Sequence, residues 1–286
     1  MFFLAQCSST TLDNTSLLRN SDTIEKHNTI VDQTPPNLHI DYQLIATKDN
    51  SEWLRSLPSG DTLDVILALN RIDRSSLLKI DTLIMPDTIG IGIELFSPYP
   101  ENIDELHAIK KILLVSYYTQ AFAVYENGMQ IRWGPGSLGK QSTPTPIGLF
   151  STNWKSKSTI STVDSSWVMD WYFNIANFRG VSMHQYSLPG YPASHACIRL
   201  YEKDAYWLYY WADQWVLDGP NIIAYGTPVF IFGTYPFGQQ KPWLLQVKNN
   251  QKLEVNQLTL IESIQKSLPI ILERQTKRDS LEKSHL

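Results

Sequence analysis

Runs of apolar residues separated by turn residues predict several β-strands in the middle of the chain. The segment Lys110–Tyr118 contains the run Ile-Leu-Leu-Val, and Gln120–Tyr125 is joined to Met129–Trp133 through Asn127-Gly128. An Asn-Gly pair between two β-prone runs is the strongest local signal for a hairpin. A last strand is expected over Pro228–Phe232.

Helical periodicity occurs in two places. Within Glu202–Val216, apolar residues recur at spacings of three and four, namely Leu208, Trp211, Ala212 and Trp215, which predicts an amphipathic helix. Residues 251–268 predict a second such helix, interrupted at Pro269, and the charged tail Glu273–Leu286 is expected to be solvated and frayed. Repeated β signals with one well-marked helix predict a β-rich α+β fold.

The pattern divides the 286 residues into four parts. Residues 8–38 are rich in Ser, Thr, Asn and Asp, as is typical of a flexible linker. We therefore expect a leader and linker over residues 1–40, a small module over 41–96, the main domain over 108–235 and a helical extension over 236–286.

Composition excludes several classes of protein. Apolar residues make up 43% of the chain and charged residues 18%, as in an ordinary globular protein. The net charge of −4 gives no sign of nucleic-acid binding. No apolar run approaches the roughly 18–20 residues that span a bilayer.

Only two cysteines are present, Cys7 and Cys197, so no internal disulfide framework is expected. The segment Leu4-Ala5-Gln6-Cys7 resembles a lipoprotein cleavage box, with Gln6 where a small residue is usual. Either a leader has been clipped and Cys7 is a lipid-anchor site, or Cys7 is incidental.

The residues around Cys197 carry the chemistry. His184 precedes it by 13 residues, and the turn-rich segment between them can fold back to bring an imidazole against the thiol. A free thiol is mostly protonated at neutral pH, and a neighbouring imidazole can remove its proton. In an extended segment, His195 and Arg199 would project to the same face as Cys197. These residues predict a nucleophilic cysteine.

Three segments carry a family resemblance. The stretch from Met183 to Leu200, with Ser-His-Ala-Cys-Ile-Arg at its end, resembles the active-site signature of the L,D-transpeptidase catalytic domain. Residues 136–150 contain Thr-Pro-Ile-Gly-Leu-Phe and resemble its second signature, and Tyr225–Ile231 resembles its closing strand. The order of the three signatures matches the family, which implies a β-sandwich-like catalytic domain with the cysteine loop at one edge.

The resemblance implies a role for each main site residue. Cys197 is the expected nucleophile and His184 the base, whose ring is oriented by the backbone carbonyl of Gln185. The N–H groups of Ala196 and Cys197 are expected to form the oxyanion hole, and Ser194 to fix the loop by hydrogen bonding.

Other residues are expected to support the site. His195 is assigned a supporting catalytic role, and Arg199 either binds a carboxylate of the substrate or forms a structural salt bridge. Three aromatic residues are expected to line the cleft: Tyr186, Tyr191 and Trp171.

Two positions depart from the family pattern. Ala196 stands where glycine is common, and Gln185 stands where glycine often follows the histidine. Glycine is favoured where φ is positive. If the chain requires a positive φ at position 196, Ala196 stores strain beside the thiol.

The segment from Gly60 to Pro86 resembles a lysin motif (LysM), a small βααβ module that binds glycan chains, although its 27 residues are fewer than usual. The opening Gly-Asp-Thr-Leu and the closing Leu-Ile-Met-Pro carry the resemblance, and Tyr42–Ala46 is expected to add a short strand. A small packing domain without a ligand is equally consistent with these residues.

The resemblance implies an L,D-transpeptidase of the periplasmic cell envelope. It would act on peptidoglycan stem peptides through a thioester at Cys197, without a metal or organic cofactor, and pass the acyl group to an amine. Water as the acceptor would make it an L,D-carboxypeptidase. The alternatives are a non-catalytic wall-binding protein and a zinc hydrolase with His184, His195 and Cys197 as ligands.

Overall fold

The computed structural model describes most of the chain from residue 40 onward, in five segments: 40–57, 60–88, 90–161, 164–249 and 252–284. The expected leader and linker, with Cys7, lie outside these residues. No helix in the described segments combines the length and the apolar character that crossing a bilayer would require.

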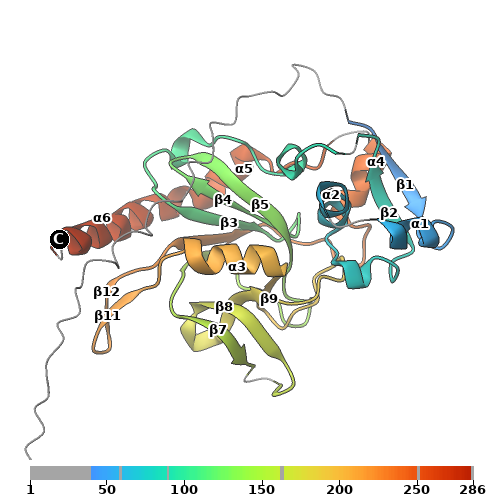
Figure 1. Cartoon of the computed structure of the whole chain (residues 1–286). Coiled ribbons are helices and arrows are strands. Elements are labelled where there is room, and N and C mark those ends of the chain that lie inside the picture. The colour runs from blue at the N-terminus through green and yellow to red at the C-terminus, as the bar shows by residue number, and fades with distance from the viewer. Residues whose placement is uncertain (1–39, 58–59, 89, 162–163, 250–251, 285–286) are drawn as a thin grey trace, which may run out of the picture. The chain divides into compact units, whose positions relative to one another are not determined.

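The first elements form a small βααβ unit, visible in blue and cyan in Figure 1. Its elements are β1 (Tyr42–Ala46), α1 (Ser51–Ser56), α2 (Asp61–Asn70), η1 (Arg74–Ser76) and β2 (Thr82–Pro86). The strands β1 and β2 pair antiparallel with Leu44 opposite Ile84. The unit has its own apolar core, which includes Leu54, Ile66, Ile72 and Leu83.

Nine strands form one continuous sheet in the order β6-β13-β3-β4-β5-β10-β9-β8-β7. Their bounds are β3 (Ile112–Ser116), β4 (Ala121–Glu126), β5 (Met129–Ser137), β6 (Gly148–Ser151), β7 (Lys155–Ile160), β8 (Val168–Ala176), β9 (Val181–Gln185), β10 (Ile198–Leu200) and β13 (Pro228–Phe232). A separate hairpin joins β11 (Val216–Asp218) to β12 (Asn221–Ala224). Short 3₁₀ helices are η2 (Ile93–Phe96), η3 (Asp104–Leu106) and η4 (Asn177–Arg179).

The central strands are buried on both faces, which explains their continuous apolar runs. On β3, Ile112 and Leu114 pack into one core, whereas Leu113 and Val115 pack into another. The second core lies between the two halves of the curled sheet, where helix α3 (Glu202–Trp211) also packs (Figure 1). Both cores therefore share β3, β4 and β13, whereas β9 and β10, beside the cysteine, pack only into the second.

The β-rich α+β fold is confirmed. The hairpin at Asn127-Gly128 forms as expected, with Glu126 opposite Met129 and positive φ values of 49° and 81° at the two turn residues. Two positive φ angles match the twist of the flanking strands.

The sheet curls as one layer, and β10 lies inside it between β5 and β9. The cysteine loop therefore leads into an interior strand of the sheet.

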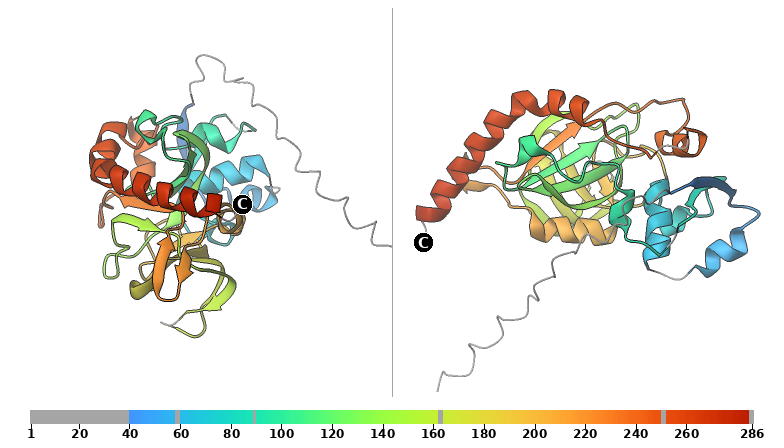
Figure 2. Two further views of the ribbon diagram at one scale, coloured as in Figure 1. Left: turned by 90° about the vertical axis from the view of Figure 1, so that its left-hand side faces the viewer. Right: turned by 90° about the horizontal axis from the view of Figure 1, so that it is seen from above.

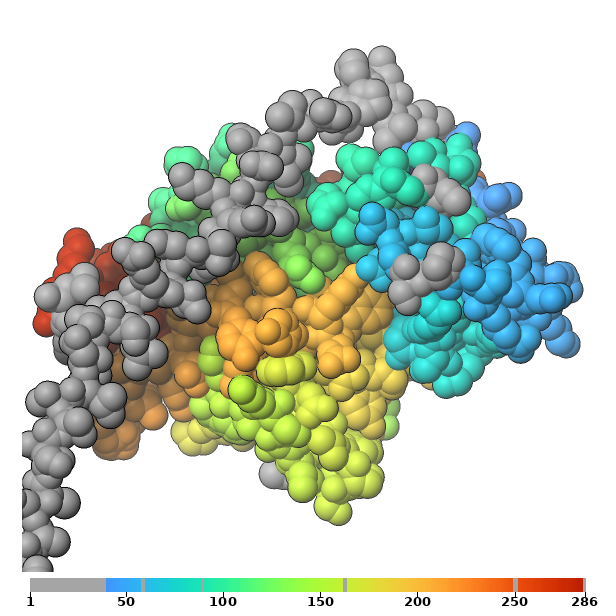
Figure 3. Space-filling model, viewed as in Figure 1, coloured from blue at the N-terminus to red at the C-terminus, as the bar shows by residue number. Residues whose placement is uncertain are grey.

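Helix α3 is shorter than the periodicity predicts. It ends at Trp211, whereas Val216 begins β11. The backbone of Asp213 is bound elsewhere, because its N–H donates to the Thr227 hydroxyl at 2.9 Å and its carbonyl accepts from the Thr227 N–H at 3.3 Å. These tertiary contacts replace the helical hydrogen bonds that the pattern predicts. On the face shown in Figure 3, α3 is exposed.

The charged C-terminal tail is helical rather than frayed. The extension contains η5 (Pro242–Leu244), α4 (Leu245–Asn249), α5 (Gln257–Ile264), η6 (Gln265–Ser267) and α6 (Leu268–Ser284). Pro269 is the second residue of α6, where a missing N–H costs nothing. Figure 2 shows α6 running alongside the sheet.

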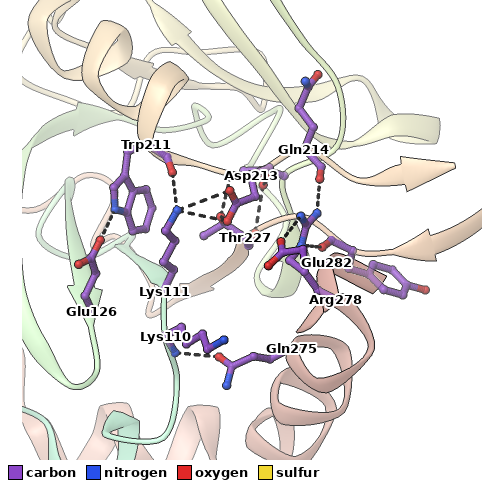
Figure 4. Close-up of polar contacts among 12 residues, drawn as sticks. Lys110, Lys111, Glu126, Trp211, Asp213, Gln214, Thr227, Gln275, Arg278 and Glu282 are labelled. Atoms are coloured by element: carbon purple, nitrogen blue, oxygen red, sulfur yellow. Dashed lines mark hydrogen bonds and ion pairs between the residues drawn. The ribbon is translucent and has the colours of Figure 1, made fainter. Parts of the chain in front are cut away.

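Polar contacts attach α6 to the sheet (Figure 4). The Arg278 guanidinium donates to the carbonyls of Gln214 and Tyr225, the latter at 2.8 Å. The Lys110 N–H donates to the Gln275 side chain at 2.7 Å. These contacts hold the tail in one position. A tail that was solvated and frayed could not form them.

The βααβ unit is joined to the segment that precedes the cysteine. Ile72 forms a β-bridge with Pro189, and the Tyr201 hydroxyl donates to the Ile72 carbonyl. The N–H of Leu188 donates to the Asp73 carboxylate at 2.7 Å, and the Asp73 N–H donates to the Leu188 carbonyl at 3.0 Å. Both flanks of the cysteine segment therefore contact the unit.

A buried arginine strengthens this junction. Arg71 caps α2 with a φ of 58° and is 2% exposed. Its Nε donates to the Thr119 carbonyl at 2.7 Å, and its guanidinium lies over the rings of Trp133 and Trp243. Burial lowers the pKa of Arg71 to about 10, so the side chain remains charged at neutral pH.

Candidate active site

Strand register brings the cysteine and the first histidine onto one face of the sheet. Cys197 immediately precedes β10, which pairs parallel with β9 so that Ile198 lies opposite Met183 and Arg199 opposite His184. Side chains two residues apart on a strand share a face. Cys197, Arg199 and His184 therefore share one face, because Ile198 and Met183 both pack into the core on the other.

This face forms the floor of a cleft of about 500 Å³. Strands β7 and β8, helix η4 and the segment before β10 provide its walls. Predicted site residues that line it are His184, Tyr186, Ser194, His195, Cys197 and Arg199. Its charged lining residues in the described part of the chain include Arg179 and Arg199 but no carboxylate.

His184 is buried and held in one tautomer. Its Nδ1 lies 2.8 Å from the carbonyl oxygen of Gln185. Because a carbonyl can only accept, Nδ1 must carry the hydrogen and Nε2 keeps a lone pair. Burial is the main cause that lowers the pKa of His184 to about 4; the hydrogen bond to Gln185 opposes it and Arg199 adds to it. The imidazole is therefore a neutral proton acceptor at neutral pH.

The thiol of Cys197 is partly exposed and has two polar neighbours. The hydroxyl of Ser182 donates to its sulfur at 3.3 Å, and the sulfur lies 3.6 Å from the carbonyl oxygen of Gly180. Ser182 is a neighbour of the thiol that the sequence interpretation did not name. Its position two residues before His184 on the same strand was the available signal.

Ala196 has a φ of +83°. The chain thus requires a left-handed conformation where Ala196 replaces the usual glycine, and the Cβ makes that conformation costly. Within the described residues, the N–H groups of Ala196 and Cys197 donate to no backbone carbonyl. The oxyanion hole expected from these two N–H groups stays a prediction.

Ser194 fixes the segment at the second signature. Its hydroxyl donates to the Cys197 carbonyl, and its own carbonyl accepts from the Lys140 N–H at 3.0 Å and the Thr143 hydroxyl at 3.1 Å. Gly139 bridges to Ser194, and a Cβ there would lie 2.2 Å from the Thr143 carbonyl. The Thr-Pro loop therefore supports the cysteine segment from behind.

His195 lies at the exposed rim of the cleft. Its Nε2 is 3.1 Å from Lys140 Nζ, and its ring lies 4.9 Å from that of Trp167. Partial desolvation, followed by Lys140 and Arg199, lowers the pKa of His195. These contacts place His195 beside the thiol segment in a supporting position.

Arg199 has no carboxylate partner among the described residues. Its guanidinium lies 4.6 Å from the centre of the Tyr186 ring. Burial lowers its pKa, whereas Tyr186, Cys197 and Tyr191 oppose that shift. The structural salt bridge considered for Arg199 is absent here, and the guanidinium faces the cleft.

Trp171 and Tyr191 do not line the cleft, contrary to expectation. A β-bulge places Trp171 and Tyr172 opposite one residue of β9, and Trp171, with a φ of 52°, packs on the tyrosines of α3. Tyr191 lies beside Lys241 in a separate cavity. Tyr172 takes the place in the cleft that was expected for Trp171.

A metal site does not form from these side chains. In the described segments, no three His, Cys, Asp or Glu side chains converge closely enough to hold an ion, and this includes His184, His195 and Cys197. The geometry therefore gives the zinc-hydrolase alternative no ligand set.

Residues 110–231 match the family model described as the L,D-transpeptidase catalytic domain. This match confirms the resemblance over that segment. L,D-transpeptidase 1 of Mycobacterium tuberculosis is 30% identical over 162 residues, which cover 51% of this chain and 57% of that protein. The chain thus matches little more than half the length of this relative.

Solved structures give a weaker similarity. An L,D-transpeptidase from Stackebrandtia nassauensis is 24% identical with a TM-score of 0.37, over 44% of this chain and 57% of that one. L,D-transpeptidase 1 of Mycobacterium tuberculosis is 26% identical with a TM-score of 0.33, over 43% and 62%.

Proposed function

We propose that this chain, whose residues 110–231 match the L,D-transpeptidase catalytic domain, is an acyltransferase with Cys197 as its nucleophile. The observation that carries the proposal is the pairing of β9 with β10, which sets His184 and Cys197 on one face of one cleft. A base and a thiol oriented by a third group are the usual parts of a cysteine acyltransferase. Here the third group is the Gln185 carbonyl.

Proton transfers in this reaction start from the neutral imidazole. His184 takes the thiol proton through Nε2, and the thiolate attacks an amide carbonyl of the substrate. The N–H groups of Ala196 and Cys197 stabilise the oxyanion. His184 then protonates the leaving amine, and a thioester remains on Cys197. An acceptor amine attacks the thioester and releases the thiol, while water in its place would give a carboxypeptidase.

Peptidoglycan stem peptides are the proposed acyl donors, as the family resemblance implies. The charge of the cleft supports this choice, because Arg179 and Arg199 line it without a carboxylate among its described lining residues. A guanidinium binds a peptide carboxylate through two parallel hydrogen bonds. The proposed location is the cell envelope, where this polymer is found.

A carbapenem tests the proposal directly, because its strained lactam acylates a reactive thiol. Incubation of the full chain should add one carbapenem to the intact mass, and Cys197→Ala should remove the adduct while the melting temperature stays unchanged. An adduct that persists in Cys197→Ala would place the nucleophile elsewhere. No adduct in the wild type would favour the non-catalytic wall-binding alternative.

Glycan binding by the βααβ unit is a separate proposal. The unit exposes Trp53 on α1, which is 43% accessible, and aromatic faces suit sugar rings. Trp53→Ala should weaken retention on purified sacculi without slowing cleavage of a soluble stem peptide. Equal losses in both assays, or none, would identify the unit as a packing domain. A point variant is needed because deletion of the unit would uncover the catalytic core.

A further inference from the structure

One polar group that touches the sulfur of Cys197, the Ser182 hydroxyl, has no role in the reaction described above. Ser182 is fully buried on β9, and its hydroxyl donates to the sulfur at 3.3 Å. Buried hydroxyls are almost always hydrogen-bonded. In the cleft, the Ser182 hydroxyl donates its hydrogen to the Cys197 sulfur.

A line of buried side chains continues behind Ser182. The Asn153 side-chain amide donates to Asn174 Oδ1 at 2.8 Å, and Asn174 Nδ2 donates to the Tyr172 hydroxyl at 3.3 Å. Ser182 lies close to the Tyr172 hydroxyl, where it opposes the rise in the pKa of Tyr172 that burial causes. These four residues are each at most 8% exposed, so water does not compete for their hydrogen bonds.

The polarity of this line is determined by its first member. Because Asn174 Oδ1 is occupied by Asn153, its amide must present Nδ2 to Tyr172. Tyr172 therefore accepts from Asn174, and its single hydrogen is free for the Ser182 oxygen. The hydrogen of Ser182 is then directed to the sulfur, and the line ends there as a donor.

The opposite neighbour of the sulfur has the reverse preference. The carbonyl of Gly180, 3.6 Å away, can accept from the protonated thiol but repels a thiolate. The Ser182 hydroxyl can donate to the thiolate, and hydrogen bonds to charged groups are stronger than those to neutral ones. When the thiol loses its proton, the contact with the Gly180 carbonyl is weakened and the hydrogen bond from Ser182 is strengthened.

We propose that Ser182 is a positioning residue that holds the sulfur of Cys197 and stabilises its thiolate, with Tyr172 and Asn174 orienting the Ser182 hydroxyl. This inference rests on the proposed function, in which Cys197 is the nucleophile. The Tyr172 ring also stacks at 6.4 Å from that of His184. Tyr172 therefore lies beside the imidazole directly, and it reaches the thiol only through Ser182.

Alkylation of Cys197 by iodoacetamide tests the proposal without requiring turnover. The rate is measured across pH in the full chain, and peptide mapping separates Cys197 from Cys7. Removing a hydrogen bond to a thiolate should move the midpoint of the alkylation profile in Ser182→Ala upward by about one pH unit. Tyr172→Phe should also raise the midpoint, by a smaller amount. Ser182→Thr keeps a hydroxyl, so its midpoint should lie between those of the wild type and Ser182→Ala.

Ser116→Ala is the matched control, because Ser116 is an equally buried serine on β3 that accepts from the Thr119 N–H. It should leave the alkylation midpoint unchanged whatever it does to stability. A midpoint in Ser182→Ala equal to that of the wild type would overturn the proposal. If Cys197→Ala retained turnover, the proposed function would fail, but the alkylation profile would still decide the role of Ser182.

Discussion

Nδ1 of His184 is hydrogen-bonded to the carbonyl of Gln185, the next residue on β9, at 2.8 Å. The partner is a main-chain oxygen, so the identity of the side chain at position 185 does not affect the contact. The departure from glycine at Gln185 therefore leaves the orientation of the ring intact. The tautomer that results places the free lone pair on Nε2.

His184→Gln should lower kcat for a stem-peptide substrate by at least about 100-fold, because a positioned general base contributes roughly that much or more. Single-turnover kinetics with circular dichroism would check both rate and fold. His195→Gln should cause a smaller loss, since His195 lies at the exposed rim. A His184→Gln variant with near-normal kcat would contradict the assignment of the base.

The depressed pKa of His184 predicts how stability depends on pH. The unfolded imidazole binds a proton near pH 6.5, whereas the folded one does so near pH 4. Between these values the unfolded state holds more protons, so the free energy of unfolding decreases as pH falls from 6.5 to 4. The buried neutral imidazole accounts for about 3 kcal/mol of the difference in unfolding free energy between low and neutral pH, and this stabilisation is fully present above pH 6.5.

Urea unfolding at several pH values between 4 and 7 measures this effect. His184→Gln should flatten the dependence, whereas His195→Gln should leave it close to that of the wild type. Identical slopes in the wild type and in His184→Gln would show that the buried imidazole does not carry it.

Ala196→Gly should raise the free energy of unfolding by about 0.5–1 kcal/mol, because glycine removes the Cβ from a left-handed conformation at a smaller entropic cost. Ala193 lies in the same loop without a positive φ, so Ala193→Gly should be destabilising instead. Chemical denaturation of both variants measures the difference. A loss of stability in Ala196→Gly would mean that no strain is stored there.

Arg278→Met should destabilise the chain by about 1–2 kcal/mol, because the carbonyls of Gln214 and Tyr225, which flank the β11–β12 hairpin, would lose a charged donor. Its neighbour Lys277 forms an ion pair with exposed Glu273 on the same helix, so Lys277→Met should leave the urea midpoint unchanged. Equal effects of the two substitutions would mean that α6 is held by its apolar face alone.

Local signals were sufficient for much of the architecture. The Asn-Gly turn and the apolar runs predicted the β4–β5 hairpin and β13, and His184 and Cys197, which the cysteine signature singled out, line one cleft. These features depend on neighbours in sequence, or on register that alternation determines.

Long-range contacts decided the features that sequence could not predict. The bulge at Trp171 changes which side chains of β8 face the cleft, and no local pattern marks it. Tertiary hydrogen bonds to Asp213 end α3 early, and contacts with the sheet order the charged tail. The contact of Ser182 with Cys197 is also long-range, because the two residues are 15 positions apart.

The contacts of Ile72 and Asp73 with the segment before Cys197 have a consequence for transplanting this domain. A fragment limited to residues 108–235 would leave the Leu188 amide without its carboxylate and the Tyr201 hydroxyl without its acceptor. The segment around Cys197 thus depends on contacts outside residues 108–235. A chimera built from it would have to include Ile72 and Asp73, which follow α2, to keep these hydrogen bonds.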